Sequence, residues 1–231
     1  AASQEGRVDV VQLLLTKKEI QINRAHDGGA TPLHITCLEG HVEIVRLLLA
    51  REEIQINQVT KHGVTPLFAA TTSGFVDIVR LLLTRKEIQI NRANKRGFTP
   101  LYAACQEGHV DIVQLLLDRE DIDVNRAESI SGQTPLYQAC RGGHTDIVRL
   151  LLARDDIKIN QVDRLSLFTP LHIACQKGRV EVVKLLLARK DIQVNQRMND
   201  GATARYLANH FNHYQIVTLL KQNGGKSYEL Y

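Results

Sequence analysis

The chain has 231 residues, of which 44% are hydrophobic and 23% charged, and its formal net charge is +4 from 29 basic and 25 acidic side chains. This composition excludes a wholly disordered chain, because enough apolar surface is present to form a core, and so small a positive excess does not indicate nucleic acid binding. The longest aliphatic runs are leucine triplets, far below the roughly 18 apolar residues of a membrane span, so we expect no membrane insertion.

The tripeptide Thr-Pro-Leu occurs five times, and these copies contain every proline of the chain. The copies begin at Thr31, Thr65, Thr99, Thr134 and Thr169, with spacings of 34, 34, 35 and 35 residues. A constant period of this length is typical of a module that stacks on copies of itself. The sequence therefore predicts one elongated array, whose function lies on the stacked surface.

The unit 63–91 contains the predicted elements in order. Thr65 can cap a first helix that begins at Pro66, since proline suits the first helical turn. Gly74 can adopt the positive φ that ends this helix, and a second helix follows over 76–83. The second helix is apolar around nearly its whole circumference, so each unit must be buried between neighbouring copies.

Charges at the ends of the second helices complement the helix dipole. An acidic residue begins each of these helices: Asp9, Glu43, Asp77, Asp111, Asp146 and Glu181. A basic residue ends each of them: Lys17, Arg51, Arg85, Arg119, Arg154 and Arg189. A period-two segment such as 54–56 then predicts a short extended arm that ends at an asparagine, and we expect this asparagine to hydrogen-bond its own turn.

The four cysteines occupy one repeated position. Cys37, Cys105, Cys140 and Cys175 each lie six residues after the threonine of their repeat, and Thr71 fills the same position in another unit. Neighbouring helices pack about 8 to 10 Å apart, whereas a disulfide requires Cα atoms within about 7 Å. We expect buried, reduced packing residues, which favour an intracellular and cytoplasmic location.

The histidines also follow the repeat. His34 and His172 come directly after Thr-Pro-Leu, where other units have phenylalanine or tyrosine, so a metal-ligand role is disfavoured. His210 and His213 are neighbours without an evident third ligand. No phosphate-binding loop, dinucleotide glycine motif or nucleophile elbow occurs. We therefore expect no enzyme, no metal and no cofactor.

The segments TPLHITCLEGHVEIVRLLL from Thr31 and TPLYAACQEGHVDIVQLLL from Thr99 resemble the pattern of the ankyrin repeat family. The resemblance covers essentially the whole chain. It implies an all-α ankyrin-repeat solenoid of stacked helix-turn-helix units with projecting β-hairpin loops. The expected parts are a partial first repeat 1–22, repeats 29–57, 63–91, 97–125, 132–160 and 167–195, a degenerate C-terminal capping repeat 201–224, and a tail 225–231.

Three departures from the family pattern stand out. The second helices lack a closing glycine and continue into a charged link, as at 85–88, so they are expected to run longer or to end in a different turn. The hairpins before Thr134 and Thr169 carry one extra residue, and the second of them has Leu167 where the turn glycine stands elsewhere. The last unit has Asn212 in place of the glycine that ends the first helix.

The resemblance implies a non-catalytic protein interaction scaffold that binds a partner across its hairpin tips and the inner face of the first helices. The candidate binding residues are Lys61, His62, Val64, Lys95, Arg96, Phe98, Glu107, Ile130, Gln133, Arg141, Arg164, Leu165 and Phe168. Phe98 and Phe168 stand directly before Thr-Pro, and they either anchor a partner or fold against their own hairpin. Ile130 and Leu165 are expected to be buried within their enlarged loops.

Other readings of the sequence stay open. The chain begins without methionine inside a repeat, which favours an excised or engineered segment. Besides a natural interaction scaffold, two alternatives stay open. The chain is then either the targeting arm of a larger enzyme or channel, or an engineered scaffold without a dedicated partner. We expect a monomer that binds one or more proteins and no nucleic acid. The family resemblance also suggests hydroxylation by an oxygenase at Asn57, Asn91 and Asn125.

Overall fold

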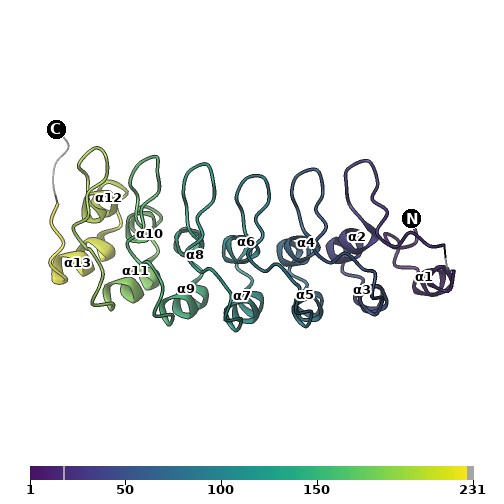
Figure 1. The fold of residues 1–231 in the computed structure, drawn as a ribbon. Helices are drawn as coiled ribbons and strands as arrows, with labels where there is room; N and C mark the ends of the chain where they lie inside the picture. Colours follow the sequence, from purple (N-terminus) through teal and green to yellow (C-terminus); the bar gives the residue numbers. More distant parts are fainter. Residues whose placement is uncertain (18, 228–231) are drawn as a thin grey trace. The chain divides into compact units, whose positions relative to one another are not determined.

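The computed structural model describes residues 1–17 and 19–227. These ranges contain thirteen helices and no strand, which confirms the all-α repeat fold (Figure 1). The chain divides into two compact units: unit 1 comprises Ala1–Ala104 and Gln114–Ile122, and unit 2 comprises Cys105–Val113 and Asp123–Tyr231. Each unit is described by itself.

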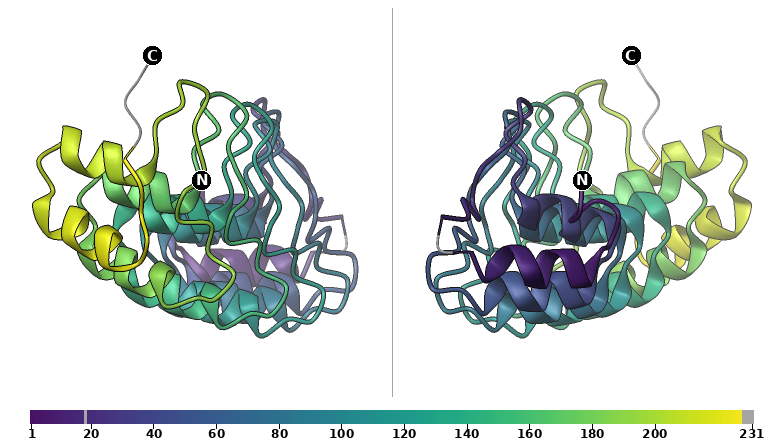
Figure 2. Two further views of the ribbon diagram at one scale, coloured as in Figure 1. Left: turned by 90° about the vertical axis from the view of Figure 1, so that its left-hand side faces the viewer. Right: turned by 90° about the vertical axis from the view of Figure 1, so that its right-hand side faces the viewer.

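Unit 1 contains five whole helices in two rows. Its helices are α1 (Val8–Leu15), α2 (Pro32–Glu39), α3 (Val42–Leu49), α4 (Pro66–Ser73) and α5 (Val76–Leu83). The first helices α2 and α4 pack side by side, and the second helices α1, α3 and α5 form the other row. Each first helix also contacts the second helix that follows it, α2 with α3 and α4 with α5, so the unit repeats one helix pair (Figures 1 and 2).

Unit 2 repeats this arrangement with six whole helices. They are α8 (Pro135–Gly142), α9 (Thr145–Leu152), α10 (Pro170–Gln176), α11 (Val180–Leu187), α12 (Ala204–His210) and α13 (Tyr214–Gln222). The first helices α8, α10 and α12 are in sequential contact, as are α9, α11 and α13. The remaining helices, α6 (Pro100–Glu107) and α7 (Val110–Leu117), belong partly to each unit.

The first helices begin and end as their residues predict. The Oγ1 atom of Thr65 accepts a hydrogen bond of 3.1 Å from the backbone N–H of Phe68, which satisfies one of the free donors of the first turn. At the other end Gly74 has φ +78°, a left-handed conformation that costs glycine nothing. Asn212 takes over this role in the last unit with φ +61°, because asparagine tolerates this conformation better than most residues.

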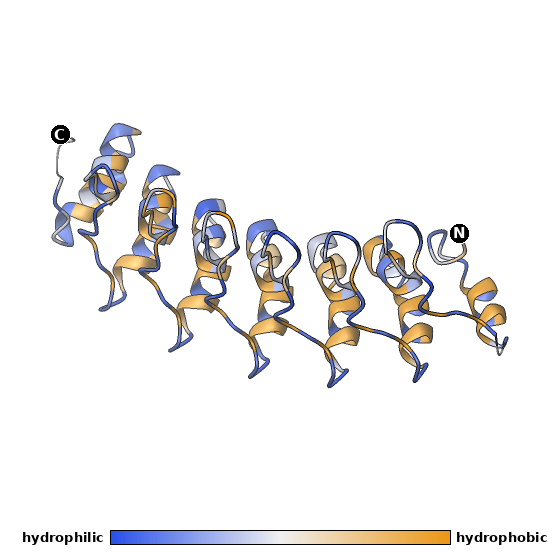
Figure 3. Cartoon of the chain, turned by 45° about the horizontal axis from the view of Figure 1, so that its top comes forward, coloured by the Kyte–Doolittle hydropathy of each residue, from blue (hydrophilic) through white to orange (hydrophobic). Residues whose placement is uncertain are grey.

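The second helices contribute large aliphatic side chains to the core. In α5 the side chains of Ile78, Val79 and Leu82 are buried, and the corresponding residues of α3, α9, α11 and α13 repeat this pattern, whereas α1 buries only Val11. Figure 3 shows the second helices as the hydrophobic row and the turns that follow them as hydrophilic. None of the described helices is both long enough and apolar enough to cross a membrane.

The second helices end in a different turn and are not extended. In α5 the helix stops at Leu83, and Thr84 keeps right-handed φ and ψ angles of −68° and −20°. The chain then turns within a few residues, with the N–H of Arg85 donating to the carbonyl of Leu82 at 3.2 Å. The charged link therefore needs no glycine, because no residue in it adopts a positive φ.

The projecting loops have hairpin form but contain no β-strand in the described residues. In one of them the N–H of Thr60 donates to the carbonyl of Val64 at 3.0 Å, and the N–H of Lys61 donates to Gly28 of the preceding loop at 3.0 Å. These isolated bonds do not form a ladder. The predicted arm at 54–56 is not a strand: Ile54 and Ile56 are buried as its period suggests, but residues 54–55 have no regular secondary structure and turns at 52–53 and 56–57 lie on either side.

Candidate functional site

The hairpin tips of unit 1 present basic side chains. Lys61, His62, Lys95 and Arg96 are exposed, and Val64 is half-buried. The N–H of Lys95 donates to the carbonyl of His62 at 3.0 Å, so consecutive tips are joined through their backbones. These tips therefore present exposed cations close to one another, with Asp27 as an exposed acid in the preceding hairpin.

The two phenylalanines before Thr-Pro lie against their own first helices. The ring of Phe98 stacks on Tyr102 with centroids 4.7 Å apart and an interplanar angle of 3°. The ring of Phe168 lies 5.8 Å from that of His172 at an angle of 55°. Both phenylalanines are half-buried. Folding against the array, rather than full exposure as anchors, therefore describes their positions.

The enlarged hairpins of unit 2 expose apolar side chains instead of burying them. Ile130 is 67% exposed and Leu165 is 64% exposed, so the expectation of burial within their loops is wrong. The buried carboxylate of Glu128 fixes the first of these loops, because it accepts hydrogen bonds from the backbone N–H groups of Ile130 at 2.7 Å and Ser131 at 2.6 Å.

Glu128 is held as the ionised form. Burial alone would raise its pKa, but the hydrogen bonds from Ser131, Ile130 and Gln133 outweigh this effect and lower the pKa. The N–H of Gln133 is one of these donors, and its half-buried side chain accepts a hydrogen bond of 2.6 Å from Gln138. Gln133 therefore serves the loop rather than facing a partner freely.

The remaining candidate residues of unit 2 are charged and exposed. Glu107 and Arg141 lie near the ends of their first helices, and Arg164 lies at a hairpin tip. Arg164 also donates from a guanidinium nitrogen to the carbonyl of Ser129 at 2.9 Å, which connects two consecutive hairpins. Arg164 thus combines an exposed charge with a structural contact.

Unit 1 contains a groove that the sequence analysis did not predict. The groove has a volume of about 680 Å³ and lies between two hairpins and the first helices α2 and α4. The apolar side chains in it belong to Ala30, Ile35, Leu38, Val64, Phe68 and Ala69. Polar groups of Gln4, His26, Glu39, Thr60, His62 and Thr72 complete it. The signal in the sequence is the small residue Ala30, which stands where two later repeats have Phe98 and Phe168.

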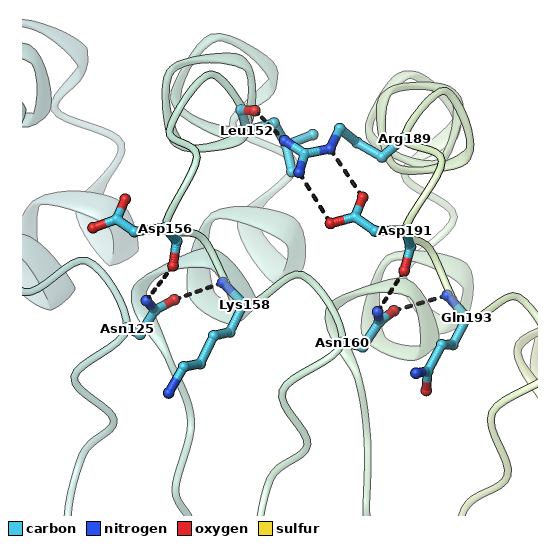
Figure 4. A network of polar contacts seen from close by, with 8 residues as sticks. All are labelled: Asn125, Leu152, Asp156, Lys158, Asn160, Arg189, Asp191 and Gln193. Carbon is cyan, nitrogen blue, oxygen red and sulfur yellow. Dashed lines mark hydrogen bonds and ion pairs between the residues drawn. The ribbon is translucent and has the colours of Figure 1, made fainter.

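A second repeated feature joins the base of each hairpin to the next repeat. The side-chain amide of Asn160 donates to the carbonyl of Asp191 at 2.7 Å, and its Oδ1 accepts from the N–H of Gln193 at 2.8 Å (Figure 4). Arg189 binds the Asp191 carboxylate with two nitrogens, each at 3.0 Å, and donates to the carbonyl of Leu152 at 2.5 Å. These contacts replace the predicted hydrogen bond of the asparagine to its own turn.

Other asparagines make the same connection. Asn23, Asn57, Asn91, Asn125 and Asn195 each donate to a backbone carbonyl 29 to 31 residues later in the chain. Neighbouring repeats are therefore held by a polar side chain in addition to apolar packing. Local sequence patterns do not reveal it, because the partner atoms lie in the next repeat.

The comparisons with known proteins agree with this architecture. The family model for ankyrin repeats matches in three copies, over residues 1–94, 87–163 and 158–229. This chain belongs to the ankyrin repeat family. A solved structure of the human ASB11 ankyrin repeat domain is similar over 98% of this chain and 97% of that chain, with 27% sequence identity and a TM-score of 0.77. The search of curated proteins found no match.

The ankyrin framework explains the cysteines and the Thr-Pro-Leu histidines. All four cysteines are buried and free, and burial raises the pKa of each thiol above its usual range. Nδ1 of His34 lies 3.1 Å from the N–H of Thr31, and its Nε2 lies 3.0 Å from the carbonyl of Val64. Within residues 1–17 and 19–227, no group of three or more histidine, cysteine, aspartate or glutamate residues is arranged to hold a metal ion.

The asparagines suggested for hydroxylation lie in this ankyrin framework with their amides engaged. Asn57 donates to Glu87 at 2.7 Å and accepts from Gln89 at 2.9 Å. An oxygenase that modified Asn57 would have to separate this side chain from the next repeat. Hydroxylation of Asn57, Asn91 and Asn125 stays a prediction, which intact-mass measurement of protein from a eukaryotic host would check.

Proposed function

We propose that this ankyrin array is a non-catalytic scaffold that binds protein partners through the hairpin tips and first helices of its units. Ankyrin repeats are generally protein interaction modules, and the present fold is one of them. The observation that carries the proposal is the exposure of side chains that the fold does not need for packing. They include the cations Lys61, Lys95 and Arg96 and the apolar residues Ile130 and Leu165.

The second helices differ from the hairpin tips, because their side chains serve the fold. Their buried residues maintain the core, and their outward charges serve the helices themselves: Lys184 lies 2.7 Å from Glu181 one turn earlier on α11. Such exposed ion pairs contribute little to stability and carry no distinct pattern for a partner. The tips, in contrast, combine apolar residues with unbalanced charge, which is the composition of a binding surface.

We also propose that the repeat units have the bounds 1–22, 29–57, 63–91, 97–125, 132–160, 167–195 and 201–224. Residues 228–231 of the tail lie outside the described residues. The four free thiols support an intracellular, cytoplasmic location. We propose a monomer without nucleic acid binding. The family match and the similar solved structure do not support the targeting-arm or engineered-scaffold alternatives.

Site-specific photo-crosslinking tests the scaffold function. A benzophenone amino acid replaces Arg96 or Leu165 at the tips, or, as matched controls, the exposed residues Arg80 of α5 and Arg149 of α9. We expect the tip variants to crosslink the same partner proteins in cells and the control variants not to do so. Equal crosslinking from the second helices would contradict the proposal.

A further inference from the structure

The groove of unit 1 is open because two repeats carry small residues directly before Thr-Pro. Ala30 and Val64 both line it. In the next repeat Phe98 stands at this position and its ring stacks on Tyr102, and in unit 2 Phe168 lies over His172. The groove of unit 1 thus has, over His34, the space that the chain fills elsewhere with an aromatic ring of its own.

The groove has the composition of an aromatic binding site. Its walls include Ile35, Phe68 and Leu38, whose side chain is 53% accessible. Leu38 is an exposed apolar residue at a position where the later repeats have polar ones: Thr72, Gln106, Arg141 and Gln176. Polar groups stand beside these walls. Nδ1 of His26 accepts a hydrogen bond from the N–H of Gly28 at 2.7 Å, which leaves Nε2 as the donor of the neutral ring. An apolar pocket with a few polar groups suits an aromatic side chain that has its own polar atom.

The charges near the groove indicate the charge of the partner segment that carries this aromatic side chain. Glu39 at the end of α2 is the charged residue in the groove lining, and the hairpin tips of unit 1 carry the exposed cations Lys61, Lys95 and Arg96 and the acid Asp27. The tips are therefore net basic, although the lining itself contains one carboxylate. Complementary charge on a partner would speed association and fix its orientation. From the groove and the tip charges together, we infer that unit 1 binds an acidic protein segment that inserts a tyrosine or tryptophan side chain between Ala30, His34 and Leu38. This inference rests on the proposed scaffold function and specifies the partner.

The test uses three short peptides against the intact chain, with binding followed by NMR chemical shifts and by calorimetry. The peptides are Asp-Glu-Tyr-Glu-Asp, the same sequence with alanine in place of tyrosine, and Lys-Arg-Tyr-Arg-Lys. We expect the acidic tyrosine peptide to shift the signals of Ala30, Leu38 and Val64. The alanine peptide and the basic peptide should each bind at least about tenfold more weakly. The alanine peptide lacks the ring, and the basic peptide is repelled by the cations of the hairpin tips.

Two substitutions taken from the chain's own repeats block the groove. Ala30→Phe places a ring over His34 as Phe168 lies over His172, and Leu38→Gln introduces the residue found at 106 and 176. Each should weaken the acidic tyrosine peptide about fivefold or more. Leu13→Gln is the control, since it removes an exposed leucine of α1, 63% accessible, that does not line the groove, and it should leave the affinity unchanged. Circular dichroism and thermal melting establish that each variant is folded.

Equal binding of the tyrosine and alanine peptides, equal binding to Ala30→Phe and wild type, or no localised shift at millimolar peptide would each overturn the inference. The scaffold function fails in a different way. The peptide can bind the groove while the tip variants crosslink no protein that the second-helix control variants do not also crosslink. In that case only the broader scaffold function is wrong. If tip crosslinking succeeds and the peptide does not bind, only the aromatic site is wrong.

Discussion

The buried side chain of His172 makes the stability of the first helix α10 depend on pH. Its Nδ1 lies 3.1 Å from the backbone N–H of Thr169 and 2.7 Å from the threonine hydroxyl, so it accepts from the backbone and must be unprotonated there. Burial lowers its pKa to about 4, and hydrogen bonding and nearby carboxylates oppose that shift only in part. The neutral ring is therefore part of the capping structure of α10.

The lowered pKa predicts a loss of stability in mild acid. Because the unfolded chain binds a proton near pH 6.5 and the folded chain only near pH 4, stability is lost as the pH falls from 6.5 towards 4. We expect about 1 kcal/mol less free energy of unfolding at pH 5.5 than at pH 7.5 from His172. Urea unfolding at both pH values measures the difference.

His172→Tyr provides the control, since Phe98 and Tyr102 already form this pair in another repeat. The variant should show a smaller pH dependence than wild type. A dependence remains in it because burial also lowers the pKa of His34. An unchanged slope in His172→Tyr would exclude His172 as its source.

Asn160 carries the second prediction at this scale. Asn160→Ala removes two hydrogen bonds to the next repeat and leaves the carbonyl of Asp191 and the N–H of Gln193 without these partners. We expect the free energy of unfolding to fall by about 1 to 3 kcal/mol in urea titrations. Asn209→Ala changes an exposed asparagine on α12 and should stay within about 0.5 kcal/mol. Equal effects would mean that the connection contributes nothing specific.

At the scale of the element, the first helices were predictable and the loops were not. Threonine caps, proline and glycine act within a few residues, so the sequence indicates where α4 begins and ends. The arms beside Asn57 alternate like a strand, but their bonding partners lie about 30 residues away, through a side chain rather than a ladder. The groove beside Ala30 was missed for a similar reason, because its walls come from separate repeats.

The hairpin that contains Leu167 yields a prediction about backbone strain. Leu167 has φ +57°, in the left-handed region, where the other hairpins have glycine. Leu167→Gly should raise the free energy of unfolding by about 0.5 to 1 kcal/mol, since the relieved strain exceeds the entropy cost of glycine. Thermal and urea unfolding measure the gain.

Gly63→Ala is the reverse change at the corresponding position. Gly63 has φ +78°, and an added Cβ would lie 2.9 Å from the backbone nitrogen of Lys95 in the next hairpin. This variant should lose more than about 1 kcal/mol, because both the conformation and the close approach disfavour alanine. If Leu167→Gly were destabilising, the side chain of Leu167 would have to contribute packing that exceeds its backbone strain.

For the whole molecule, a stacked array predicts that stability varies with the number of packed neighbours. Within unit 1, α1 buries only Val11, and Leu13 on the same helix is 63% exposed. In contrast, α5 buries Ile78, Val79 and Leu82. The framework cysteines follow the same rule, since their thiols should resist alkylation until the surrounding repeat opens.

Hydrogen exchange measured along unit 1 tests this gradient. Amides of α1 should exchange through a smaller opening free energy than those of α5, because fewer apolar contacts must be broken. Leu82→Ala should lower the stability of α5 and of its contacting neighbour α3 by about 2 to 5 kcal/mol, whereas Leu13→Ala should change little. Uniform protection over α1, α3 and α5, with equal effects of the two substitutions, would show that unit 1 opens as a single cooperative block. A graded profile would instead mean that each helix pair depends chiefly on the pairs it contacts, so that a substitution in the groove near Ala30 can alter binding there without unfolding the rest of the unit.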